Sequence, residues 1–229
     1  MLVWIASVPR SGNTLFRVLL HTYSGLPTYS LFGDALFLEN RAICEAMGHC
    51  QIPVSQGEVH RLQDMPGVYF VKVHARSPWL WDGCGDVPAF FIVRDPRAVA
   101  VSLAHYSAWR TGKGSVEDLA RDGWLKKGWS VHVQSWLDAK VRCAIVRYEN
   151  MIARPFRTVR QAVETLGLDV ELIKKERPAF ESLHAMMPRF FRRGQVDGWK
   201  KELSPPLAAL LWEQSKEVAM KLGYTEGGT

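Results

Sequence analysis

Residues 6–20 read ASVPRSGNTLFRVLL, and this stretch predicts a strand that passes through a tight turn into a helix. The apolar run at residues 2–5 is typical of a buried strand, and apolar side chains recur at helical spacing from Leu15 onward. The turn between them consists of Arg10, Ser11, Gly12, Asn13 and Thr14. A glycine lets the backbone approach an anion closely, the N–H groups that open a helix form its positive end, and an arginine adds a permanent cation. The turn therefore predicts a phosphate-binding loop.

The loop differs from the nucleotide-triphosphatase pattern GxxxxGK[ST], because its cation precedes Gly12 and no lysine follows a second glycine. An ordinary strand-to-helix turn with an exposed arginine is the alternative interpretation. Motifs elsewhere in the chain are needed to decide between the two.

Three segments of the chain together resemble one enzyme family. They are VPRSGNT (8–14), FIVRDPRAVAVSLAHY (91–106) and RRGQVDGWK (192–200), in the order and at the approximate spacing seen in sulfotransferases that use 3′-phosphoadenosine 5′-phosphosulfate. Two shorter segments, FVKVHA (70–75) and RYENM (147–151), are similar to stretches of the same family. The resemblance covers nearly the whole chain. It implies transfer of a sulfuryl group to a hydroxyl or amine of a small-molecule acceptor.

The resemblance also implies which residues bind the donor. In the family the first segment holds the 5′-phosphosulfate, the second holds the 3′-phosphate through an arginine and a serine, and the third closes over the 3′-phosphate. The implied donor-binding positions are Arg10, Ser11, Gly12, Asn13, Thr14, Arg94, Ser102, Arg192, Arg193 and Gly194, with Tyr148 against the adenine.

Two departures from the family leave parts of this expectation open. Leu15 stands where many members have an aromatic residue that stacks on the adenine, so this half of the base pocket must be built differently. Residues 204–206, Ser-Pro-Pro, interrupt the stretch that many members use for dimerisation. We therefore do not predict that dimer, and the oligomeric state stays open.

Lys72 and His74 inherit the leaving-group and base roles from the resemblance, and Arg10 adds charge for the leaving group. Lys72 and His74 are two positions apart in an extended segment, so both side chains point to the same side. An imidazole with a pKa of about 6.5 is suited to accept the acceptor's proton during in-line displacement. Because cationic side chains supply the positive charge, we expect no metal. A hydrogen-bonded histidine at a strand end is the simpler interpretation of His74 taken alone.

Composition bounds the class of protein. The chain has 229 residues, of which 47% are hydrophobic and 23% charged, and neither a linker nor a repeat divides it, so we expect a single domain over residues 1–229. A formal net charge of +6 favours anionic partners such as a nucleotide, nucleic acid or an acidic membrane. The four cysteines form no CxxC pair, and no apolar run reaches about 18 residues. We therefore expect a cytoplasmic protein without stable membrane association.

Four apolar runs predict strands at residues 2–6, 68–73, 89–93 and 143–147. Helical segments separate them, so the expected fold is a three-layer α/β fold with a mostly parallel central sheet flanked by helices. Arg10, His74 and Arg94 each lie at or just past the end of a predicted strand. Ligands bind at the carboxyl ends of strands in such sheets, so three cationic or basic groups should converge on one crevice.

Further helices are expected after Asp95, which is placed to cap a helix that begins with Pro96, and over residues 115–139, 155–166 and 205–222. Ser204 is the expected cap of the last helix. Segments 24–60 and 177–198 are expected to be irregular and to form the acceptor loops. Phe32, Phe37, Trp79, Trp81 and Tyr106 are candidate walls of an acceptor pocket.

Two other functions are weighed against sulfuryl transfer. A small-molecule kinase with a variant phosphate loop requires a carboxylate that holds Mg²⁺, for which Asp82 and Asp86 are the candidates. A basic nucleic-acid-binding protein would use Arg94, Arg97, Arg192 and Arg193, but the chain contains no recognition-helix or stacking-platform motif. We therefore expect a small-molecule acceptor rather than nucleic acid as the partner.

Overall fold

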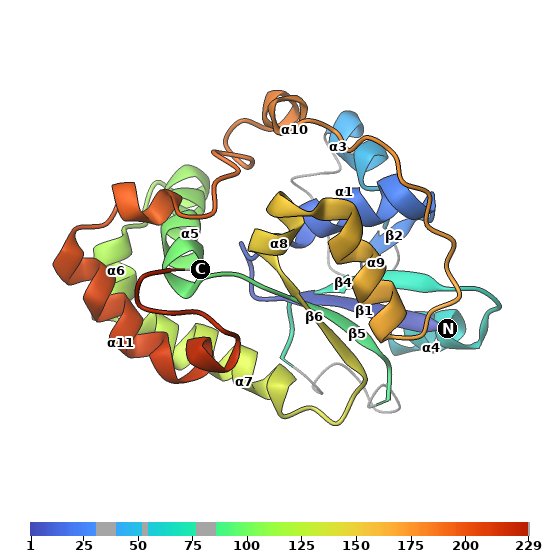
Figure 1. Cartoon of the computed structure of the whole chain (residues 1–229), viewed down its shortest axis with the longest axis horizontal. Helices are drawn as coiled ribbons and strands as arrows, with labels where there is room; N and C mark the ends of the chain where they lie inside the picture. The colour runs from blue at the N-terminus through green and yellow to red at the C-terminus, as the bar shows by residue number, and fades with distance from the viewer. Residues whose placement is uncertain (31–39, 52–54, 77–85, 229) are drawn as a thin grey trace.

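A six-stranded sheet forms the centre of the molecule (Figure 1). The computed structural model of the chain describes residues 1–30, 40–51, 55–76 and 86–228. Its strands are β1 (Leu2–Ser7), β2 (Thr28–Ser30), β3 (His49–Gln51), β4 (Tyr69–Val73), β5 (Ala89–Val93) and β6 (Cys143–Arg147). They are ordered β3-β2-β4-β1-β5-β6, and each neighbouring pair of these described strands is parallel. The expected α/β fold with a parallel sheet is confirmed.

The central strands are buried on both faces. All residues of β1 and of β5 are buried, as expected for parallel strands that read as continuous apolar runs. Successive side chains point to opposite faces of the sheet, so Trp4 and Phe91 belong to one hydrophobic core while Ile5 and Phe90 belong to the other. The sheet therefore separates two cores.

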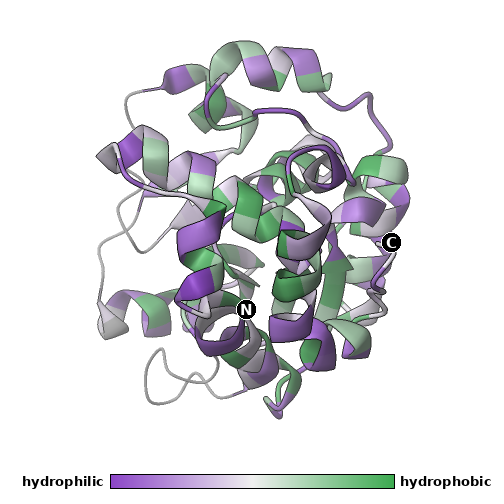
Figure 2. Ribbon diagram, turned by 90° about the vertical axis from the view of Figure 1, so that its left-hand side faces the viewer, coloured by the Kyte–Doolittle hydropathy of each residue, from purple (hydrophilic) through white to green (hydrophobic). Residues whose placement is uncertain are grey.

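Helices cover both faces (Figure 1). The core that contains Trp4 packs against α4 (Gln56–Asp64), α5 (Pro96–Thr111), α6 (Val116–Arg121), the π-helix η1 (Leu125–Ser130), α7 (Val131–Leu137), the 3₁₀-helix η2 (Gly198–Lys201) and α11 (Pro205–Lys221). The core that contains Ile5 packs against α1 (Asn13–Ser24), α3 (Arg41–Ala46), α8 (Tyr148–Ala153), α9 (Pro155–Thr165) and α10 (Phe180–Met186). Hydrophilic and hydrophobic residues alternate along these helices in Figure 2, as expected for helices that cover a core with one face.

The expectation that residues 24–60 are irregular is wrong. This region contains β2, α3, β3 and the start of α4, and residues 177–198 contain α10. The sequences of β2 and β3, TYS and HCQ, are too short and too polar to be recognised as strands. They exist because β4 offers an open edge, on which Tyr29 pairs with Val71 and β3 then pairs with β2.

The other helices lie close to the expected positions. Asp95 caps α5 by accepting a hydrogen bond from the Arg97 N–H, and Pro96 is the first residue of that helix. The helix expected over 115–139 is divided into α6, η1 and α7. Ser204 precedes α11, but its side chain makes no capping hydrogen bond. Among the described residues no helix combines the length and apolar character that a membrane span requires.

Candidate active site

Four candidate residues lie at or within three residues of the ends of neighbouring strands of the sheet. The strands β4, β1, β5 and β6 lie side by side, and they lead into His74, Arg10, Arg94 and Tyr148. Parallel strands present their carboxyl ends at one edge of the sheet. From β1 the chain passes to β2 on one side, while β5 and β6 lie on the other side. This reversal is a topological switch point, where α/β sheets form their ligand crevices.

A cavity of about 490 Å³ lies at this edge. Its lining includes Arg10, Gly12, Asn13, Thr14, Lys72, His74, Arg94, Ser102, Tyr148, Arg192, Arg193 and Gly194. The structure thus brings the sequence motifs together around one space. Ser11 is the exception, because it is buried outside the lining and its N–H donates to the Val8 carbonyl at 3.2 Å. Ser11 closes the turn instead of facing the cavity.

The backbone of the phosphate loop has the shape of an anion-binding nest. Arg10 has a φ of +73° and Gly12 a φ of +106°. Left-handed residues in a turn direct backbone N–H groups toward an anion, and here the Ser11 N–H is used within the turn instead. Arg10 is also the only non-glycine residue of the described chain with a positive φ, a strained conformation that concentrates at functional sites. The N–H groups of the first turn of α1 have no acceptor within their own helix and complete the loop.

The Arg10 guanidinium joins the loop to two other segments. Its Nε donates to Ser102 Oγ on α5 at 3.2 Å, and its Nη2 donates to the Phe190 carbonyl at 3.0 Å. The guanidinium carbon lies 4.1 Å from the centre of the Phe190 ring and 4.9 Å from that of Tyr106. Burial, together with the nearby charge of Arg94, lowers the pKa of Arg10 to about 10. Arg10 therefore remains a cation at neutral pH, in surroundings that favour the arrival of an anion.

Arg94 rests on the ring of Tyr148. Its guanidinium carbon lies 4.0 Å from the ring centre, its Nη2 donates to the Gln195 carbonyl at 3.2 Å, and its Nη1 lies 3.5 Å from the Arg10 carbonyl. Its Nε is buried and has no hydrogen-bond partner within the described part of the chain. Across that same part, neither Arg10 nor Arg94 forms an ion pair with a carboxylate. Both cations therefore line the cavity without a carboxylate partner among the described residues.

The His74 ring is held by the end of β1. Its Nδ1 lies 2.9 Å from the Ser7 carbonyl and 3.3 Å from Ser7 Oγ. A carbonyl only accepts, so Nδ1 carries the hydrogen and the lone pair of the neutral ring is on Nε2. Asn13 Nδ2 donates to Ser7 Oγ at 3.2 Å and to the Ile5 carbonyl at 2.9 Å. The same short segment thus supports both the phosphate loop and the histidine.

Residues 190–195, which we term the basic segment, lie across the cavity. Carbonyls of this segment accept hydrogen bonds from Arg10 and Arg94, whereas its own arginines bind Glu202. Gly194 has a φ of +61°, and a Cβ there would collide with the Phe180 ring of α10. In Figure 1, α10 lies at the top of the molecule, between the helices around α5 on one side and those around α8 on the other. The basic segment follows α10 in the chain.

A buried network holds the turn between β5 and α5. Asp95 forms an ion pair with Arg97 at 2.7 Å, and both side chains are about 1% exposed. The carbonyls of Thr225 and Glu226, near the C-terminus, accept hydrogen bonds from Arg97. Glu149, directly after Tyr148, accepts from the Asp95 N–H at 3.2 Å.

The same network sets the charge state of its members. Glu149 also accepts a hydrogen bond from the Tyr224 hydroxyl at 3.0 Å, and burial raises the pKa of Glu149. Burial and the adjacent Glu149 raise the pKa of Tyr224 well above its usual value. The tyrosine therefore stays protonated and donates to the carboxylate.

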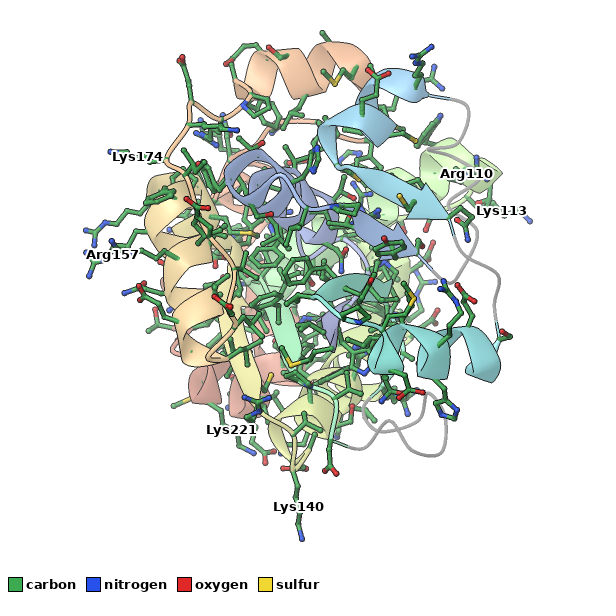
Figure 3. All side chains as sticks on the ribbon, turned by 90° about the vertical axis from the view of Figure 1, so that its right-hand side faces the viewer. Arg110, Lys113, Lys140, Arg157, Lys174 and Lys221 are labelled. Carbon is green, nitrogen blue, oxygen red and sulfur yellow. The ribbon has the colours of Figure 1, made fainter. Side chains whose placement is uncertain are left out.

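Not all of the positive charge faces the cavity. Lys140, Arg157 and Lys174 project outward at the surface in Figure 3, the last two on the same side of the molecule. Arg110, labelled beside Lys113 in the same view, lies at the end of α5 and also lines the cavity. The +6 charge is therefore shared between the cavity and the solvated surface.

Some expected residues are outside the described part of the chain, and some that matter were not expected. Phe32, Phe37, Trp79 and Trp81 lie outside the described residues, whereas Tyr106 lines the cavity. Glu202, Phe190 and Ser7 contact the site cations or the histidine, although no sequence motif predicted a role for them. For Phe190 a signal existed in its position beside the RRG motif, but for Glu202 none did.

A comparison with known protein families identifies the family of this chain. The family model described as the sulfotransferase domain matches residues 2–222. The chain belongs to the sulfotransferase family. A sulfotransferase is an enzyme of group transfer, so the cavity is its candidate active site. A comparison with curated proteins found no match.

Solved structures share the fold of this sulfotransferase at low sequence identity. Retinol dehydratase in complex with androsterone and the inactive cofactor PAP superposes with a TM-score of 0.66 and 16% identity, over 95% of this chain and 80% of that chain. Mouse sulfotransferase SULT7A1 complexed with PAP gives 0.64 and 19%, over 96% and 84% of the two chains. The sulfotransferase domain from the curacin biosynthetic pathway gives 0.54 and 18%, over 97% of each chain.

Proposed function

We propose that this sulfotransferase transfers a sulfuryl group from 3′-phosphoadenosine 5′-phosphosulfate to a hydroxyl or amine of a small-molecule acceptor, with His74 as general base. The proposal rests on one observation: the phosphate loop, Arg94 and the Lys72–His74 pair lie at the ends of three different strands yet line one cavity. The donor supplies an activated sulfuryl group on a phosphate leaving group.

The residues of the cavity fit such a donor. The nest at Arg10 and Gly12 suits the 5′-phosphosulfate, and Arg94 with Ser102 suits the 3′-phosphate. The buried Nε of Arg94, which has no partner in the described part of the chain, is a hydrogen-bond donor suited to a phosphate oxygen. Tyr148 and Phe191 line the same cavity beside Leu15, and their rings offer apolar surface to an adenine. These rings are our candidates for the base pocket that Leu15 leaves incomplete.

His74 is oriented for proton transfer. Because its Nδ1–H donates to the Ser7 carbonyl, the Nε2 lone pair is the one that accepts the proton of the acceptor's hydroxyl or amine. Ser7 Oγ, which is itself hydrogen-bonded to Asn13, restrains the same edge of the ring. Lys72 lies two residues before His74 and lines the same cavity. Lys72 and Arg10 stabilise the negative charge that develops on the leaving phosphate.

The two alternative functions have weaker support. Of the carboxylates considered for Mg²⁺ in a kinase, Asp82 lies outside the described residues, and Asp86 precedes the amino end of β5, at the edge of the sheet opposite the cavity. A nucleic-acid interface would need Arg97, which is buried against Asp95. Membership of the sulfotransferase family favours sulfuryl transfer over both.

A small molecule is the proposed acceptor. Solved relatives include retinol dehydratase with androsterone and with retinol, both of them small molecules. In this chain Tyr106 and Phe190 contribute aromatic surface to the cavity that also contains His74. This surface suits a partly apolar acceptor.

Calorimetric titration tests the proposal. The purified chain should bind adenosine 3′,5′-bisphosphate more tightly than ATP and should not bind single-stranded DNA. With the phosphosulfate donor, a panel of phenols, sugars and amines should then yield at least one sulfated product. Tighter binding of ATP together with a phosphorylated product would support the kinase instead.

A further inference from the structure

Glu202 lies between three groups at one side of the cavity. Its Oε1 is 2.7 Å from Arg192 Nη2 and 3.2 Å from Arg193 Nη1, and its Oε2 is 2.7 Å from His105 Nε2. Glu202 follows η2 and lines the cavity itself. A single carboxylate thus holds both arginines of the basic segment.

The contacts with Glu202 bring together two arginine side chains that would otherwise point in different directions. Residues 192–195 have no helical structure, and adjacent side chains in such a segment point to different sides. Arg192 and Arg193 would then diverge. Their side chains are 30% and 45% exposed, so without a partner both would sample many rotamers in solvent. Because both contact the same oxygen atom, they are held side by side.

We infer that Glu202 is a positioning residue that orients Arg192 and Arg193 together toward the 3′-phosphate of the donor. The inference rests on the proposed function, which gives the two arginines to that phosphate. Each guanidinium has five N–H donors and the pairs with Glu202 occupy few of them, so the others remain for phosphate oxygens.

Glu202 is charged at neutral pH. Burial alone would raise its pKa, but hydrogen bonds from Arg192 and His105 and the charge of both arginines hold the pKa below its usual value. Its negative charge also opposes an incoming phosphate. The two effects have opposite signs: loss of orientation weakens donor binding, whereas loss of repulsion strengthens it. Because two long side chains depend on one carboxylate, we expect orientation to prevail.

The substitution Glu202→Gln removes the charge and keeps the shape. We expect affinity for adenosine 3′,5′-bisphosphate to fall roughly tenfold, because a neutral amide holds the two arginines more weakly than a carboxylate and the ligand must then order more of two rotamer-rich side chains. Affinity for 5′-AMP, which lacks the 3′-phosphate, should not change. Glu217→Gln, an exposed change on α11 outside the cavity lining, is the matched control and should leave both affinities as they are.

A double-mutant cycle with Arg193→Ala shows whether Glu202 acts through the arginine. If it does, the losses in bisphosphate affinity from Glu202→Gln and Arg193→Ala are less than additive. Glu202→Asp keeps the charge but shortens the side chain by one methylene, and it should also weaken bisphosphate binding. This variant replaces Glu202→Gln in the experiment if the Gln variant is unfolded.

Three results would overturn the inference: unchanged or tighter bisphosphate binding by Glu202→Gln, equal losses for bisphosphate and 5′-AMP, or strict additivity in the cycle. A wild-type protein that binds bisphosphate and 5′-AMP equally would instead overturn the assignment of the 3′-phosphate site. The two failures are therefore distinguishable.

Discussion

Gly12 lies directly against the ring of Tyr148, and a Cβ atom on Gly12 would be 2.6 Å from Cδ2 of that ring. The tyrosine carries Arg94 on its face, so the glycine determines where both side chains stand.

Gly12→Ala should therefore displace Tyr148 and Arg94, and it should weaken binding of adenosine 3′,5′-bisphosphate by about tenfold or more, because a charge-assisted contact is lost. Gly25→Ala is the matched control: Gly25 also has a positive φ, at the end of α1, but nothing lies within 4 Å of its Cβ position. Both variants should lose some thermal stability, since alanine is strained at positive φ. Equal affinities in the two variants, measured by calorimetry, would contradict this role of Gly12.

Arg94→Ala should weaken bisphosphate binding at least tenfold and 5′-AMP binding little, because charge-assisted hydrogen bonds to the 3′-phosphate contribute about 1.5 to 3 kcal/mol each. Arg157→Ala, a change on the outer face of α9, serves as the control for loss of a positive charge (Figure 3). A folded Arg94→Ala variant with normal bisphosphate affinity would show that Arg94 does not serve the donor.

His74→Ala should leave bisphosphate affinity nearly unchanged and lower turnover by roughly 10² or more, because a general base acts on the acceptor and not on the bound donor. The assay should use a poorly acidic alcohol, since an acidic phenol ionises without help. His60→Ala on α4, outside the cavity lining, is the control. Full turnover of the His74 variant on the alcohol would assign the histidine a structural role.

His132 should make stability depend on pH between about 6.5 and 4. Burial, with a smaller effect of Arg76, lowers the pKa of His132 from 6.5 to about 4. Below pH 6.5 His132 binds a proton in the unfolded chain but not in the folded protein, so the free energy of unfolding decreases as the pH falls to 4, by about 3 kcal/mol. His132→Phe preserves stacking on Phe91 and removes this proton. Its melting temperature should fall less over that range than that of the wild type, and an equal fall would contradict the assignment.

Sulfuryl transfer should continue in the presence of EDTA. In the proposed site Arg10, Lys72 and Arg94 supply the positive charge that metal ions supply in many phosphoryl-transfer enzymes. The rate of product formation should be equal before and after chelation. Loss of activity that Mg²⁺ restores would favour a metal-dependent mechanism.

The fold was predictable where strands are long and buried. The runs that became β1, β4, β5 and β6 are apolar enough to be recognised alone. The strands β2 and β3 were not, because three polar or mixed residues become a strand only through the partner that tertiary structure provides.

The site was predictable where a motif carries the chemistry. The candidate site residues taken from the motifs line one cavity, apart from Ser11, whose N–H is used within the turn. Supporting residues such as Ser7, Glu149 and Glu202 make contacts with segments distant in sequence, and the local sequence does not predict such contacts. The direction of the Arg10 side chain, toward Ser102 on α5, was not predictable for the same reason.

The bonds between Arg97 and the carbonyls of Thr225 and Glu226 have a consequence for the order of events during synthesis. Residues 95–97 leave the ribosome long before residue 226, yet the hydrogen bonds of the buried Arg97 are completed only by that distant segment. Until then the turn that presents Arg94 lacks part of its support. The part of the cavity beside Arg94 therefore takes its final shape only after residues 225 and 226 have been synthesised.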